Sequence, residues 1–170
     1  MATPKKIPSP KKILPSKEPK KNLLLRFSNF ILVAAVLIVY VPTFNLGFTE
    51  LDDSIFIKET RDYNKDLSNL ATSFQRGVFN ATEDVYFRPL LLDSFILNYH
   101  VSGEHIKGWH IVNVMLHLIA VLLLFLLLKK VGLDELSSFL LTLIFAVHPM
   151  LSQAVAWIPG RNDTLFHHLV

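Results

Sequence analysis

Three long apolar stretches dominate the pattern of hydrophobic and polar positions along this chain. They cover residues 23–44, 108–128 and 133–149, and charged residues are rare inside them. Each is close to the roughly 20 residues with which an α-helix crosses a ~30 Å hydrocarbon layer. The first stretch lacks the small-residue cleavage site that ends a signal peptide, so we expect it to be retained. The pattern therefore predicts three transmembrane helices.

The overall composition agrees with this pattern. Of the 170 residues, 51% are hydrophobic and only 18% are charged, which is too apolar for a soluble domain of this size. Cysteine is absent, which fits an oxidising exterior and decides nothing further. We expect an all-α polytopic membrane protein.

A basic tail comes before the first apolar stretch. Seven of its first 21 residues are lysine and five are proline, so residues 1–22 are predicted to be disordered and solvated. Lys129 and Lys130 separate the second and third stretches, and the positive-inside rule places both basic segments in the cytoplasm. The loop 45–107, net acidic by four, is then outside. We interpret the tail as a topology signal that touches anionic lipids, and expect no nucleic-acid partner.

A pair of carboxylates, Asp52 and Asp53, stands just after the first apolar stretch, in "NLGFTELDD". At the centre of a membrane span each would cost about 2.5–3.5 kcal/mol, so we expect both at the outer rim of the bilayer. An ordinary solvated loop explains such a pair as well as a site does. In an extended segment the two side chains would point to opposite sides.

Polar residues interrupt the second apolar stretch at a helical spacing. His110, Asn113 and His117 fall on one face of a helix, and His117 lies about 10 Å deeper than His110. Hydrogen-bonding groups at that depth must face protein or a wet cavity. They either bond neighbouring helices or line a pocket.

The third apolar stretch breaks at His148 and Pro149. Residues 150–161 are predicted to form an outer re-entrant or interfacial segment, and 162–170 the start of a fourth transmembrane helix. Three polar residues meet at this junction: Arg161, Asn162 and Asp163. Either of the last two can cap the new helix instead of serving a site.

The outer loop contains one further helical pattern. A weakly amphipathic helix is predicted over about 90–101, too short to span a bilayer and suited to its surface. Arg88 stands at its start, where it can clamp a phosphate through two bonds or extend to lipid headgroups.

Four segments in order, "NLGF…LDD", "YFRPL", "GWHIVNVMLH" and "FAVHPMLSQAVAWIPGRNDTL", carry a family resemblance. Over residues 23–170 the chain resembles the amino-terminal part of the GT-C membrane glycosyltransferases. More narrowly, it resembles the transmembrane and tetratricopeptide-repeat O-mannosyltransferases and their bacterial relatives. The resemblance implies a GT-C-like helical bundle. It also implies transfer of a sugar from a polyprenyl-phosphate carrier to a protein or glycan acceptor outside the cytoplasm.

The resemblance also suggests roles for individual residues. It places the outer-loop D-D motif of the family on Asp52 and Asp53, with Asp52 as the general base for an inverting transfer. Arg88 and Arg161 are the candidates for the donor phosphate. The candidates for lining the pocket are His110, Asn113, His117, His148, Gln153 and Asp163. No cofactor is assigned, and the use of a divalent metal is left open.

The chain departs from the family in several respects. Gln153 stands where eukaryotic members carry a glutamate, so a proton or metal role at that position does not carry over. No tetratricopeptide repeat is present, and the chain stops inside the fourth helix, so we expect a fragment that is inactive by itself. An inactive scaffold, a transporter-like protein and a plain membrane anchor are the alternatives. Polar groups outside the membrane core argue against transport.

The sugar, the acceptor and the organism are not determined by these patterns. By likeness to the shorter bacterial relatives we expect the bacterial plasma membrane, or the endoplasmic reticulum if the protein is eukaryotic.

Overall fold

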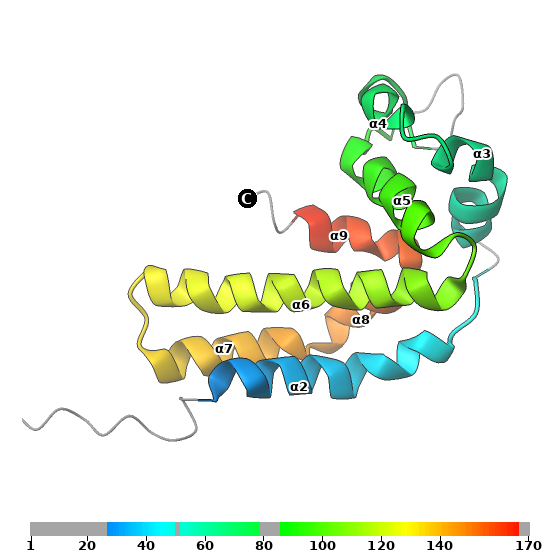
Figure 1. The fold of residues 1–170 in the computed structure, drawn as a ribbon. Helices are drawn as coiled ribbons and strands as arrows, with labels where there is room; N and C mark the ends of the chain where they lie inside the picture. Colours follow the sequence, from blue (N-terminus) through cyan, green and yellow to red (C-terminus); the bar gives the residue numbers. More distant parts are fainter. Residues whose placement is uncertain (1–26, 50–51, 79–85, 167–170) are drawn as a thin grey trace, which may run out of the picture.

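A computed structural model describes residues 27–49, 52–78 and 86–166. Within these ranges the chain forms helices and turns and no strand, which confirms the all-α prediction (Figure 1). The predicted tail 1–22 lies outside the described residues.

In the part of the chain that the structure describes, two helices are long and apolar enough to cross a membrane. The first is α2, Ser28–Tyr40, which continues as the 3-10 helix η1, Val41–Asn45. The second is the 25-residue helix α6, Ile106–Lys130. The two lysines that end α6 suit the negative end of the helix dipole.

The third apolar helix is shorter than predicted. α7, Glu135–Ala146, ends before the predicted limit at 149, and the chain bends by 48° into η4, Pro149–Leu151, and α8, Ser152–Ala156. A third membrane crossing requires this bent pair to act as one span. The break has a local cause, because the residue before a proline is driven out of the helical region, and His148 has φ −67° and ψ 128°.

The membrane helices pack around α6, with α2 and α7 side by side against it (Figure 1). One apolar core joins these elements: Leu32, Val36, Tyr40, Val114, Val121, Phe125, Phe139, Ala146 and Val155. Many other large apolar side chains on the same helices remain exposed in the protein alone, among them Ile119, Leu123 and Leu126 of α6. Exposed apolar residues are expected on helix faces that contact lipid.

The outer loop is folded over one end of α6. It contains η2, Ser54–Glu59; α3, Arg61–Asn64; α4, Asn69–Thr72; η3, Ser73–Gln75; and α5, Pro89–Ser102. α5 occupies the position of the predicted surface helix and starts with a proline, which is well suited to the first turn. Two short elements complete this end: η5, Ile158–Gly160, and α9, Arg161–Phe166.

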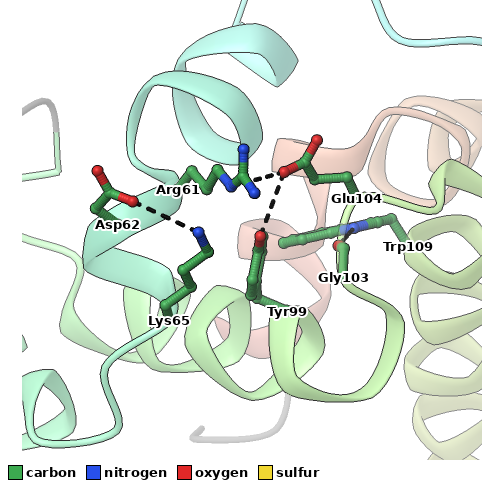
Figure 2. Close-up of polar contacts among 7 residues, drawn as sticks. All are labelled: Arg61, Asp62, Lys65, Tyr99, Gly103, Glu104 and Trp109. Atoms are coloured by element: carbon green, nitrogen blue, oxygen red, sulfur yellow. Dashed lines mark hydrogen bonds and ion pairs between the residues drawn. The ribbon is translucent and has the colours of Figure 1, made fainter.

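Several polar contacts cluster at the turn between α5 and α6 (Figure 2). Arg61 Nε lies 2.9 Å from Glu104 Oε1, and the Tyr99 hydroxyl donates to the same carboxylate at 3.4 Å. The Trp109 indole donates to the carbonyl of Gly103 at 2.9 Å, where φ of +55° favours glycine. The turn therefore contacts both α3, through Arg61, and the start of α6, through Trp109.

Candidate functional site

Some of the predicted site residues line one cavity at this outer end. The cavity has a volume of about 250 Å³ and is named here the Asp52 cavity. Its lining consists of Asp52, Phe56, Val78, Tyr86, Arg88, Leu91, Trp157, Pro159, Gly160, Asn162 and Asp163. Asp52, Arg88 and Asp163 are thus brought together from segments more than a hundred positions apart in the chain.

The two carboxylates of the D-D motif have different surroundings. Asp52 is half-buried on the cavity wall, whereas Asp53 is only 1% exposed and accepts a hydrogen bond from the Thr49 backbone N–H at 2.8 Å. The expectation of an extended segment was wrong, because both residues lie in a helical turn and Asp53 has φ −61° and ψ −39°. Successive helical residues point about 100° apart, so the turn still separates the two side chains.

Arg88 lies between two cavities of different character. It lines the Asp52 cavity and also a second cavity of about 250 Å³, here named the apolar cavity. The apolar cavity is lined by Phe87, Arg88, Pro89, Leu90, Leu91, Asn162 and Leu165. The guanidinium carbon lies 5.5 Å from the ring centroid of Tyr86, on the polar side of this junction. Arg88 therefore offers a cation where a polar space meets an apolar one.

Arg161 does not reach either of these cavities, although the sequence made it a candidate for phosphate. Its side chain is completely buried, and its guanidinium donates to Asn98 Oδ1 at 2.8 Å and to two backbone carbonyls at 3.4 Å. The same group lies over the rings of Phe95, at 4.9 Å, and Trp109, at 5.4 Å. Burial lowers the pKa of Arg161 to about 9 while nearby Asp53 acts to raise it, so the charge persists at neutral pH.

The polar face predicted for α6 points inward, as expected. His110, Asn113 and His117 are each at most 2% exposed. Asn113 Nδ2 donates to the carbonyls of Val155, at 3.1 Å, and Trp157, at 3.0 Å. These bonds correspond to the helix-bonding alternative rather than to a pocket lining.

His117 has a similar structural position. Its Nε2 donates to the carbonyl of Ala146 at 3.0 Å, at the last residue of α7. The ring also meets Tyr40 edge-on at 5.1 Å between centroids. His117 thus satisfies a carbonyl freed by the break in the third apolar helix.

The remaining pocket candidates are His148, Gln153 and Asp163. His148 and Asp163 line a third cavity of about 640 Å³, which is mainly apolar. Both side chains are exposed, as is Gln153. Only Asp163 of these three also lines the Asp52 cavity.

Some residues of the site were not identified from the sequence. Asn98 and Trp109 hold Arg161, and Tyr86 shares the cavity wall with Arg88. The available signal for Asn98 was a polar residue on an otherwise apolar helical face. Among the described residues, no three His, Cys, Asp or Glu side chains converge on a position for a metal ion.

The fold and the site define an all-α membrane protein with a charged cavity over one end of its helices. The chain is similar to Protein O-mannosyl-transferase Tmtc1 of Drosophila melanogaster, 34% identical over 134 residues that cover 76% of this chain and 16% of that protein. It is 31% identical over 140 residues to Homo sapiens Protein O-mannosyl-transferase TMTC3, and these residues cover 79% of this chain and 15% of that protein. It is 40% identical over 93 residues to Mus musculus Protein O-mannosyl-transferase TMTC4, and these residues cover 46% of this chain and 13% of that protein.

These similarities confirm the resemblance to the transmembrane and tetratricopeptide-repeat O-mannosyltransferases. The chain spans about one sixth or less of the length of these curated relatives. No family model and no solved structure matches it.

Proposed function

We propose that the chain is part of a membrane glycosyltransferase that uses a polyprenyl-phosphate-linked sugar. The acceptor is a hydroxyl of a protein or glycan outside the cytoplasm, and the names of the relatives favour mannose as the sugar. The observation that carries this proposal is the Asp52 cavity, in which a carboxylate, Asp52, and a guanidinium, Arg88, line one space. The same arginine borders the apolar cavity, which suits a donor with a charged head and a hydrocarbon tail.

Asp52 serves as the general base in this proposal. The acceptor oxygen attacks the anomeric carbon while its proton passes to the Asp52 carboxylate. The bond from the anomeric carbon to the phosphate oxygen breaks, and the electron pair leaves with the polyprenyl phosphate. A single displacement of this kind inverts the anomeric configuration, and general-base catalysis contributes about 10²- to 10⁴-fold.

Arg88 is the group proposed to bind the departing phosphate. A guanidinium can donate two parallel hydrogen bonds to phosphate oxygens and stabilise the charge that develops on them. We revise the role of Arg161, because its buried guanidinium already donates to Asn98 and to backbone carbonyls. His110, Asn113 and His117 are likewise proposed to support the cavity from below rather than to touch the sugar.

The topology of the proposal follows from the charge pattern of the sequence. The amino terminus and the turn after Lys130 face the cytoplasm, and the Asp52 cavity faces the opposite side. The relatives reported above come from animals, and the compartment stays a prediction.

The Asp52→Asn substitution tests the base directly. In the full-length protein it keeps the size of the side chain but removes the proton acceptor, so turnover should fall about 10²- to 10⁴-fold while donor binding survives. Asp62→Asn is the matched control, because Asp62 is an exposed acid that pairs with Lys65 on the outer surface (Figure 2). The measurement is sugar transfer from a polyprenyl-phosphate donor, normalised to folded protein. Unchanged transfer in Asp52→Asn would contradict the role of Asp52 as the base, whereas no transfer by the wild-type protein would contradict the proposed function and favour an inactive scaffold.

Arg88→Lys tests the phosphate role. The lysine keeps the charge but cannot make the paired bonds of a guanidinium, so the donor Kd should rise about tenfold. Arg61→Lys, at an exposed arginine paired with Glu104, provides the control. If even Arg88→Ala leaves donor affinity unchanged, Arg88 does not bind the phosphate.

A further inference from the structure

Two buried side chains of opposite charge, Asp53 and Arg161, lie next to residues that line the Asp52 cavity, without forming a direct ion pair. Among the described residues, Asp53 is the one Asp or Glu, and Arg161 the one Lys or Arg, with less than a tenth of its surface exposed. Asp53 is 1% exposed and Arg161 is fully enclosed. Asp53 is also the charge that acts on Arg161 against the effect of burial.

Each member of the pair is the chain neighbour of a residue on the cavity wall. Asp53 follows Asp52 in the chain, and Arg161 stands between Gly160 and Asn162. Asp52, Gly160 and Asn162 line the cavity. The two segments that carry the pair therefore face each other across this space. Asp53 and Arg161 are therefore buried next to the cavity wall and do not line the cavity themselves.

Aromatic packing connects the two segments. Phe56, on the helical turn that follows Asp53, packs on Phe95 with 5.2 Å between ring centroids. Phe95 packs in turn on Trp109 at 5.6 Å, and the Arg161 guanidinium lies over both of these rings. Asn98 fixes the orientation of the guanidinium through its 2.8 Å hydrogen bond.

Isolated buried charges are unfavourable, and removal of one partner leaves the other uncompensated. Among the described residues, Asp53 Oδ1 and Arg161 Nε are both buried without a hydrogen-bond partner, so each side chain is the nearest candidate to compensate the other's charge at longer range. Loss of either charge should therefore displace the segment that carries it, and with it one wall of the cavity.

We propose that Asp53 and Arg161 form a buried electrostatic clamp that sets the distance between Asp52 on one wall of the cavity and Asn162 and Asp163 on the other. Both are positioning residues for the proposed sugar transfer, and neither touches the substrate. This part of the inference rests on the proposed function. The existence of the clamp does not.

A double-mutant cycle on stability tests the clamp without any activity. The variants are Asp53→Asn, Arg161→Met and the double variant, and the measurement is the thermal unfolding midpoint of the protein in detergent micelles. Each single variant should lower the midpoint by about 10 °C, and the double variant should unfold at a higher temperature than Arg161→Met alone. If Arg161→Met does not accumulate, addition of Asp53→Asn should restore folded protein.

An exposed ion pair on the same side of the molecule provides the control. Arg61 and Glu104 are about half exposed, and their contact is drawn in Figure 2. The cycle of Arg61→Met and Glu104→Gln should be additive within about 2 °C. An equally additive Asp53–Arg161 cycle, or a double variant that does not restore accumulation, overturns the clamp.

Kinetics of the full-length protein separate positioning from phosphate binding. Asp53→Asn and Arg161→Lys should lower kcat by about 10- to 100-fold per folded protein, with the donor KM changed less than about threefold. Arg161→Lys should retain more activity than Arg161→Met, because it keeps the charge. A higher donor KM at unchanged kcat would instead assign Arg161 to the phosphate and overturn the positioning role. If the wild-type protein transfers no sugar while the stability cycle shows coupling, the proposed function fails and the clamp stands.

Discussion

Asn113 offers the sharpest test of how the membrane helices support the cavity. Its amide donates to the carbonyls of Val155 and Trp157, and the carbonyl of Ile158 lies 3.4 Å away. These carbonyls belong to the broken segment that leads into the cavity wall at Pro159. Asn113→Leu keeps most of the volume of the side chain and removes both donor hydrogens.

The expected loss follows from the two good bonds. Polar bonds between membrane helices average about 0.6 kcal/mol each, which sets a lower value near ~1 kcal/mol for the pair. Leaving the two buried carbonyls without a donor costs about 1–3 kcal/mol per group, which raises the upper value to about 6 kcal/mol. For a domain of about 150–250 residues, at about 2–4 °C per kcal/mol, the unfolding midpoint should therefore fall by roughly 2–24 °C.

Two measurements check this expectation. Thermal unfolding in detergent micelles reports the global effect, and Met115→Leu on the same helix is the matched control, because Met115 is 48% exposed. Hydrogen exchange reports the local effect, and the backbone amides of 155–160 should exchange faster in Asn113→Leu, whereas those in the middle of α6 should not. A midpoint equal to that of the Met115→Leu control, with unchanged exchange over 155–160, would refute the reasoning.

Three further predictions concern the end of a helix, a close contact and the topology. Hydrogen bonds from the Ser137 side chain and backbone lower the pKa of Asp134. The ionised Asp134 side chain therefore stabilises the fold above pH ~4, and this stabilisation is lost as the pH falls through the pKa of the folded protein. Asp134→Ala should lower the unfolding midpoint at pH 7, and the difference from the wild type should shrink below pH ~4. Gly160→Ala should cost about 1–3 kcal/mol in chemical denaturation, because a Cβ there would meet the backbone of α8, whereas Gly47→Ala, with open space around it, should be neutral. A reporter fused after Lys130 should read cytoplasmic and one in the turn between α5 and α6 extracytoplasmic; the reverse pattern would contradict the proposed orientation.

Several features could be predicted from the sequence because they depend on local chemistry. The apolar length of α6 determines that it can cross a membrane, and the 3.6-residue period places Asn113 on its inward face. Pro149 lacks an N–H and constrains the residue before it, so the break in the third apolar helix was predictable to within a few residues. The order of four motifs was enough to identify the related transferases, since similarity of sequence does not require coordinates.

Tertiary packing decides which of the candidate residues face the cavity and which are buried behind it. Asp52 and Asp53 are equivalent as residue types, and only the helical turn and its neighbours expose one to the cavity and bury the other. Arg88 and Arg161 were equally plausible phosphate ligands. The packing of α9 against α5 and α6 encloses Arg161 between aromatic rings, while Arg88 remains at the cavity. Sequence patterns report which side chains share a helix face, but the approach of segments a hundred residues apart depends on how the helices pack, and no local pattern contains that information.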